Sequence, residues 1–260
     1  MRNNAFLLLI ALSIAVLTGC TATTQTKDAT YPNPAAPGFN AAESDSQAIA
    51  IADEVMEAMG GRKAWDQTRF IRFTFFGRRH LIWDRHGKRA RIEVPGDSLV
   101  YLYSYAQGDQ ATTYKNGEPV TEADSILKYT EQARRIWIND TYWLVMPFKL
   151  KDSGVTLKYL GEENIGQDGV VECDVLELTF ASVGVTPQNK YHVWVDTQEH
   201  LVRQWAYFSS AEDSEPRITT VWLDYQPYGR ILLSGNRGGD RALSDIDVPE
   251  SLPDEVFTSY

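Results

Sequence analysis

The sequence predicts a mainly β (α+β) fold: a large curved antiparallel sheet that forms an incomplete barrel, with helices covering its open concave side. Two groups of about five or six short runs, rich in β-branched and aromatic residues, carry this prediction. Tight turn signals such as Asn116-Gly117 separate the runs, which favours antiparallel neighbours. A sheet of this length curls because strand twist accumulates. Two segments with helical spacing can cover one face.

The first ordered element is a predicted helix from Asp45 to Met59. Its apolar residues recur at the spacing of one helical face. The pair Gly60-Gly61 then provides a left-handed stop. The members of the apolar face are Ala48, Ile51, Ala52, Val55 and Met59.

Strands follow the helix in two groups with a helical insertion between them. The insertion covers about residues 122–146, as one or two helices, and it ends before Met146-Pro147 because proline resists helical continuation. The first group comprises residues 69–76, 79–85, 88–94, 98–106 and 110–115. The second group comprises residues 155–160, 170–180, 191–196, 201–209, 218–225 and 230–234.

The start of the chain has the pattern of a secretory signal peptide. A short start with one positive charge, Arg2, precedes an apolar stretch that is too short to span a bilayer. The stretch ends in Leu17-Thr18-Gly19-Cys20, which resembles the bacterial lipobox. We therefore expect a signal peptide over 1–19, lipid attachment at Cys20, a disordered tether over 20–44 and a single half-barrel domain over 45–260. Thr21 after the cysteine favours the outer membrane of the bacterial envelope.

Charge and cysteine content narrow the possible partners. The formal net charge of −10 argues against nucleic acid as a partner and against binding anionic lipid through bulk charge. Membrane contact is therefore expected only through the N-terminal lipid anchor. The second cysteine, Cys173, lies in an apolar-rich run beside Glu172 and Asp174, so a buried, unreactive thiol is expected.

Two segments resemble a family of uncharacterised bacterial envelope lipoproteins. One runs from Asn139 to Leu150 and contains Tyr142-Trp143-Leu144-Val145-Met146-Pro147-Phe148-Lys149-Leu150, and the other runs from Tyr191 through Trp205 to Gly229. That family is similar to the LolA/LolB-like superfamily of outer-membrane lipoprotein carriers and receptors. The resemblance implies an incomplete antiparallel barrel whose open side is plugged by helices, and it implies binding of acyl chains. It supplies no catalytic residue for this chain.

Catalytic and metal-binding patterns are absent from the sequence. The four histidines form no His-Glu-x-x-His helix, and no paired-cysteine site exists. His80, His86 and Asp84 are the nearest approach to a metal set, but turn and strand histidines are more often structural. No Gly-x-Ser-x-Gly elbow occurs. We therefore expect no metal, no cofactor and no enzymatic activity.

Aromatic residues are the positive signal for a binding site. The chain has 7 Trp, 13 Tyr and 10 Phe, and most lie in the predicted strands. They either fill a packed core or line an apolar cavity, since both use the same residue types. Met146-Pro147-Phe148 is the expected lid. The cavity candidates are Trp83, Tyr101, Tyr103, Trp143, Met146, Phe148, Trp194, Trp205 and Trp222.

Three functions stay open at this point. The first is an outer-membrane-anchored lipoprotein that binds an apolar or lipid-like ligand in a half-barrel cavity. The second is an envelope protein–protein interaction module with a packed core and an unknown protein partner. The third is a hydrolase of an envelope substrate, which would require a nucleophile or metal cluster that the sequence does not offer.

Overall fold

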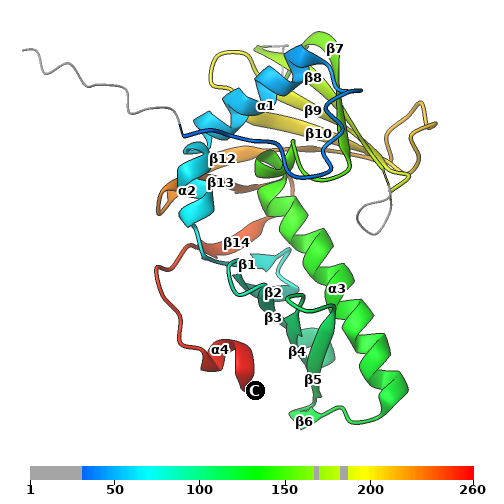
Figure 1. Ribbon diagram of the computed structural model, residues 1–260, viewed down its shortest axis with the longest axis vertical. Coiled ribbons are helices and arrows are strands. Elements are labelled where there is room, and N and C mark those ends of the chain that lie inside the picture. Colours follow the sequence, from blue (N-terminus) through cyan, green and yellow to red (C-terminus); the bar gives the residue numbers. More distant parts are fainter. Residues whose placement is uncertain (1–30, 167–169, 182–186) are drawn as a thin grey trace, which may run out of the picture. The chain divides into compact units, whose positions relative to one another are not determined.

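Two antiparallel sheets dominate the computed structural model, which describes residues 31–166, 170–181 and 187–260 (Figure 1). The larger sheet has seven strands. In spatial order they are β14 (Leu243–Asp247), β1 (Phe70–Phe75), β2 (Arg79–Asp84), β3 (Arg89–Val94), β4 (Leu99–Ser104), β5 (Gln110–Lys115) and β6 (Glu118–Pro119).

The smaller sheet has five strands, and a separate two-stranded hairpin follows it in the chain. The five strands in spatial order are β11 (Ile218–Val221), β10 (Val202–Phe208), β9 (Lys190–Asp196), β8 (Val171–Phe180) and β7 (Val155–Ile165). The hairpin pairs β12 (Leu223–Tyr228) with β13 (Ile231–Asn236).

Short connections join the five-stranded sheet to the hairpin and the hairpin to the seven-stranded sheet. Only Trp222 separates β11 from β12, and its backbone N–H still donates to the Arg203 carbonyl at 2.7 Å. The left-handed φ of 59° at Asp224 then interrupts the extended backbone. At the far end of the hairpin, Asn236 bridges to Ala242 just before β14. The prediction of a mainly β fold, with a large antiparallel sheet not closed into a barrel and a few helices, is confirmed, although the strands form three separate sheets.

Four α-helices and two 3-10 turns accompany the strands among the described residues. The helical insertion predicted between the strand groups is one continuous helix, α3. In Figure 1, α3 passes along β3, β4 and β5. It also contacts β13 and the 3-10 turn that directly follows α3 in the chain. The elements are α1 (Ser46–Ala58), α2 (Gly61–Gln67), η1 (Pro95–Asp97), α3 (Ala123–Val145), η2 (Met146–Lys149) and α4 (Glu255–Thr258).

The corner between α1 and α2 requires glycine. Gly60 has a φ of +111°, and a Cβ atom there would lie 2.4 Å from the Arg230 carbonyl oxygen. The neighbouring Met59 carbonyl accepts a hydrogen bond from the Leu232 N–H at 3.0 Å, so this corner packs directly against β13. The left-handed stop predicted at Gly60 is confirmed. The apolar face of α1 is buried in the main core, as its spacing predicts.

The segment before α1 is held against β7. The backbone N–H groups of Ala36, Asn40 and Asp45 donate to carbonyls of residues 151, 155 and 157 at 2.9–3.0 Å. The sequence predicts a disordered tether over residues 20–44, whereas in the structure Ala36 and Asn40 of this segment are hydrogen-bonded to the domain. These bonds occupy part of the edge of β7, and a segment ordered by backbone pairing needs no apolar periodicity of its own.

Residues 31–260 form one compact unit with its own hydrophobic core, so this part of the chain can be studied alone. Within the described residues, no helix is both long and apolar enough to cross a membrane. The predicted signal peptide and lipid-attachment residue Cys20 lie outside the described residues.

Candidate functional site

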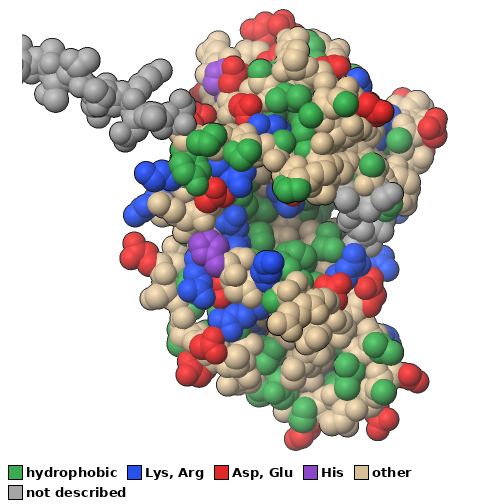
Figure 2. Space-filling view, viewed as in Figure 1, with side chains coloured by type: hydrophobic (Ala, Val, Ile, Leu, Met, Phe, Trp, Pro, Cys, Tyr) green, Lys and Arg blue, Asp and Glu red, His purple; other side chains and the backbone are tan. Residues whose placement is uncertain are grey.

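A cavity of about 510 Å³ lies between the C-terminal half of α3 and the five-stranded sheet. Figure 2 shows it as a hollow with hydrophobic side chains on its floor. Known ligand pockets have volumes of about 300–1,000 Å³. The lining residues are Arg79, Arg135, Ile136, Ile138, Asn139, Asp140, Tyr142, Trp143, Phe180, Asn189, Tyr191, Trp205, Tyr207 and Ile218.

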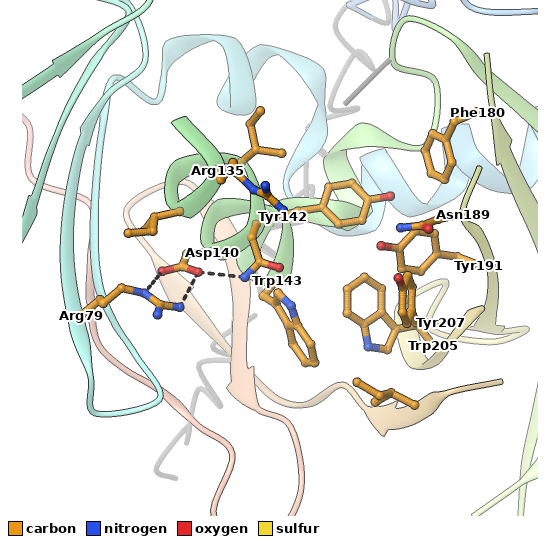
Figure 3. Close-up of a pocket in the computed structure, with 14 residues that line it drawn as sticks. Arg79, Arg135, Asp140, Tyr142, Trp143, Phe180, Asn189, Tyr191, Trp205 and Tyr207 are labelled. Carbon is orange, nitrogen blue, oxygen red and sulfur yellow. Dashed lines mark hydrogen bonds and ion pairs between the residues drawn. The ribbon is translucent and has the colours of Figure 1, made fainter. Parts of the chain in front are cut away.

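Helix α3 forms one wall of the cavity. Arg135, Ile138 and Tyr142 follow one another at spacings of three and four residues, and Ile136, Asp140 and Trp143 do the same. Residues at these spacings share one side of a helix. The C-terminal half of α3 thus lines the cavity with two rows of side chains, of which Tyr142 points toward the five-stranded sheet and Asp140 toward Arg79 (Figure 3).

Stacked aromatic rings of β9 and β10 form the opposite wall. Tyr191 and Tyr207 pair across the ladder, and Trp205 lies two residues before Tyr207 on the same face of β10. The Trp205 and Tyr191 rings stack with centroids 5.0 Å apart and an interplanar angle of 23°. Phe180 meets Tyr191 edge to face at 5.7 Å. These contacts between neighbouring rings fix the side chains of the wall in the absence of a ligand.

The rings of the helix meet the rings of the sheet at one side of the cavity. Trp143 contacts Trp205 edge to face, with centroids 4.9 Å apart. Tyr142 lies 5.9 Å from the Trp205 ring and 5.7 Å from the Tyr191 ring. These contacts fix the distance between the two walls and form an apolar surface on which a hydrocarbon chain can be buried.

A buried ion pair closes the cavity on the side of the seven-stranded sheet. Arg79 of β2 donates from Nε and Nη2 to the two carboxylate oxygens of Asp140 at 2.6 and 2.8 Å. Asn139 donates to the same carboxylate at 2.9 Å, and the Asp140 side chain is fully buried. Burial raises the pKa of Asp140, and the bonds from Arg79 oppose this rise. The pair ties α3 to the β1–β2 hairpin.

Arg135 differs from its neighbour Arg134. Arg134 forms ion pairs with Asp109 at 3.2 Å and with Glu131 at 3.4 Å. Arg135 is exposed at the cavity, and among the residues that the structure describes it forms no ion pair. The cavity therefore carries one positive charge that no carboxylate of the described residues neutralises.

Two polar atoms of the lining residues have no hydrogen-bond partner among the described residues, although both are buried. They are the Tyr142 hydroxyl and the Trp205 Nε1. Figure 3 shows Tyr142 reaching from α3 toward Asn189 and Tyr191, and Asn189 hydrogen-bonds Tyr191 through its side chain. Burial raises the pKa of both tyrosines, which keeps both hydroxyls protonated.

Only some of the cavity candidates named from the sequence lie here. Trp143 and Trp205 line the cavity, and Trp222 packs behind Trp205 with ring centroids 5.7 Å apart. The guanidinium of Arg237 covers Trp222 at 3.6 Å and donates to the Trp143 carbonyl at 2.7 Å. This arginine supports the aromatic wall from outside the cavity.

The remaining candidates pack elsewhere. Trp83, Tyr101 and Tyr103 lie on the seven-stranded sheet, where Trp83 meets Trp137 at 6.0 Å. Trp194 lies in a second cluster on the opposite face of the five-stranded sheet from Tyr191, because successive side chains of a strand alternate.

The expected lid is part of the core. Met146, Pro147 and Phe148 are all buried in η2, beneath α1. Phe148 stacks on Trp65 with centroids 4.2 Å apart and an interplanar angle of 6°. A segment packed in this way is fixed in place and does not cover the mouth of the 510 Å³ cavity.

The described side chains form no metal-binding cluster. In that part of the chain, no three His, Cys, Asp or Glu residues gather as a metal site requires. His80 contacts the Thr74 hydroxyl, and His86 contacts the Asp66 carbonyl. Asp84, which lies between these histidines in the sequence, binds Arg69 and Arg89. Cys173 is fully buried, as its neighbours predicted.

A scan of known protein families finds no match, and a search of curated proteins finds none either. Solved structures do show similarity. A DUF1329 family protein from Desulfovibrio piger is 16% identical, with 81% of this chain and 96% of that chain covered and a TM-score of 0.43. A putative outer membrane lipoprotein-sorting protein domain from Vibrio parahaemolyticus is 10% identical, with 81% and 96% covered and a TM-score of 0.42.

A LolA superfamily protein from Nitrosomonas europaea is also similar. It is 14% identical, with 82% of this chain and 97% of that chain covered and a TM-score of 0.40. The likeness predicted from the sequence, to LolA-like proteins and to an uncharacterised family, is thus found among solved structures.

Proposed function

We propose that this chain is a lipid-anchored protein of the bacterial outer membrane that binds an apolar or lipid-like ligand and catalyses no reaction. The observation that carries the proposal is the cavity of about 510 Å³ with aromatic walls from α3, β9 and β10. Its lining is mostly apolar with a few polar groups, as is typical of small-molecule binding sites. The lipobox-like Leu17-Thr18-Gly19-Cys20 supports the anchor.

The cavity also distinguishes this proposal from an interaction module. The interaction module was predicted to have a packed core, and a cavity of this size with apolar walls is not expected of it. Here Trp143, Trp205 and Tyr191 hold each other in place around an open volume. Unpaired Arg135 at the cavity fits a ligand whose apolar part is buried and whose polar end stays near solvent.

The binding experiment uses residues 31–260, extracted with organic solvent to remove co-purified lipid. We expect mass spectrometry of the extract to find a lipid, and we expect the extracted protein to bind a fluorescent acyl probe. Ile138→Trp should weaken binding because the larger ring occupies part of the cavity, whereas Ile126→Trp on the exposed start of α3 should not. No extracted lipid and no probe binding would refute the proposal.

The anchor is tested separately in the full chain. Cys20→Ser removes the expected lipid-attachment thiol and leaves the described residues unchanged. We expect the natural chain to fractionate with outer membranes and to incorporate labelled palmitate, and we expect the variant to do neither. Equal membrane fractionation of both forms would contradict lipid attachment at Cys20.

A further inference from the structure

The surface around α2 is basic, although the chain as a whole is acidic. Ten of the 25 lysines and arginines, but only two of the 35 acidic residues, lie within the 30 residues 62–91. Figure 2 shows Lys and Arg side chains gathered on the left of the view, where Figure 1 places α2. We name the set around α2 the basic patch, and its members are Arg62, Lys63, Arg85, His86, Lys88 and Arg230.

Three segments that are far apart in the chain assemble the basic patch. Two members belong to α2 itself. The turn between β2 and β3 adds three more, and Arg85 and His86 of this turn hydrogen-bond backbone carbonyls at the C-terminal end of α2. The turn between β12 and β13 adds Arg230, which donates to the Gln67 side chain at 2.7 Å. The fold thus brings these cations to one surface and holds them there.

The protein neutralises few of these charges. Within the described residues, Arg62 is the one member of the basic patch with an ion pair, to Asp66 at 2.7 Å. The exposed carboxylate of Glu57 also approaches the start of α2. The five lysines and arginines outnumber these two carboxylates, so the basic patch is positively charged. Exposed charges are stable in water without a partner, so the position of the basic patch has to indicate its role.

The described part of the chain begins beside the basic patch. The Tyr31 hydroxyl donates to Asp66 at 3.4 Å, and the Pro34 carbonyl accepts a hydrogen bond from Arg62 at 3.2 Å. Tyr31 follows Cys20, the expected lipid-attachment residue, by 11 positions, so the connecting chain spans about 40 Å at most. A lipid on Cys20 would therefore keep α2 close to the membrane surface.

We propose that the basic patch contacts the anionic phospholipid headgroups of the membrane that holds the lipid anchor. Such headgroups attract lysine and arginine side chains within about 10 Å of the surface, and a basic patch is a common second signal beside an acyl chain. The rest of the chain carries the excess of acidic residues and is repelled, so α2 is turned toward the lipid. This contact rests on the proposed anchor and adds to it, and the net charge of the whole chain does not predict it.

The test measures co-sedimentation of residues 31–260 with vesicles, so it does not depend on lipid attachment at Cys20. Phosphatidylcholine vesicles with about one-third phosphatidylglycerol should bind the protein at about 20 mM salt and release it at about 300 mM. Vesicles of phosphatidylcholine alone should not bind it.

Three variants locate the contact, and all their substitutions fall on exposed side chains. The patch variant carries Lys63→Gln, Lys88→Gln and Arg230→Gln and should bind the anionic vesicles at least about tenfold more weakly. The control variant makes the same change of net charge outside the basic patch, with Lys115→Gln, Lys128→Gln and Arg217→Gln, and should bind like the natural sequence. The charge-preserving variant, with Lys63→Arg, Lys88→Arg and Arg230→Lys, should also bind like the natural sequence.

The outcomes separate this proposal from the proposed anchor. No binding to the anionic vesicles would overturn the membrane contact and leave the basic patch to an acidic protein partner. Equal weakening in the patch and control variants, or binding that persists at high salt, would also overturn it. None of these results affects lipid attachment at Cys20, which palmitate labelling of the full chain tests. Absence of that labelling would remove the anchor and leave the vesicle result unchanged.

Discussion

Replacing Arg79 with methionine should destabilise the protein more than replacing Asp140 with asparagine. The Asp140 side chain is 0% exposed, whereas the Arg79 side chain keeps 23% exposure. Arg79→Met leaves a buried carboxylate with Asn139 as its remaining side-chain donor, and removing one partner of a buried pair costs about 3–5 kcal/mol. Asp140→Asn leaves an arginine that still reaches water, so we expect a loss of about 1–3 kcal/mol.

The loss of folding stability caused by Arg79→Met should depend on pH. Burial raises the pKa of Asp140 in the folded state, and the variant lacks the arginine that opposes this rise. A carboxyl group with a raised folded-state pKa binds more protons when folded. Its contribution to stability is therefore present below the unfolded-state pKa and is lost as pH rises through the folded-state pKa. The deficit of the variant should be largest near neutral pH and should shrink in acid.

Urea unfolding of residues 31–260 measures both effects, with curves at about pH 7 and about pH 4.5. The double variant Arg79→Met with Asp140→Leu removes both charges and should recover much of the loss, because apolar replacements of a buried pair are often neutral. Equal losses below about 1 kcal/mol in both single variants would refute the reasoning. A deficit that does not change with pH would refute the pKa argument.

Three further predictions concern single side chains. Arg135→Gln should weaken binding of parinaric acid about two- to fivefold relative to its methyl ester, whereas Arg134→Gln should not. An equal effect of Arg135→Gln on the acid and the ester would exclude recognition of the ligand's charge. Arg237→Met should lower the free energy of unfolding in urea by more than about 3 kcal/mol, because Arg237 is 2% exposed, covers Trp222 and makes four hydrogen bonds. A loss below about 1 kcal/mol would contradict its supporting role. Cys173 is fully buried, and burial raises its pKa to about 12. It should therefore resist thiol reagents at about pH 8 until the protein is unfolded, and rapid labelling of the folded protein would show local opening.

The strands and helices could be predicted because their signals are local. Asn116-Gly117 predicted a hairpin, and both residues have positive φ, 53° and 84°, in the turn between β5 and β6. The apolar spacing of α1 and the glycine after it depend on neighbouring residues only. The docking of residues 36–45 on β7 was missed because backbone hydrogen bonds place no requirement on side-chain type.

The site was predicted less completely, because it depends on residues far apart in the chain. Arg79 and Asp140 are 61 positions apart, and nothing near either residue indicates the pair. Strand alternation was informative: it places Trp194 on the opposite face from Tyr191, so Trp194 could have been excluded from the cavity and Tyr191 included. Tyr142 lies within the segment that carried the family resemblance, but aromatic content alone did not distinguish it from core residues.

The location of the ligand is the central claim, and indole N–H signals in ¹⁵N NMR test it most directly. The chain has 7 tryptophans, all within residues 31–260, which gives one signal for each. Titration with a fatty acid should shift the signals of Trp143 and Trp205, which line the cavity, and should leave Trp194 on the opposite face of the sheet unchanged. Shifts of Trp194 without Trp143 and Trp205, or no shifts at saturating fatty acid, would contradict binding in this cavity.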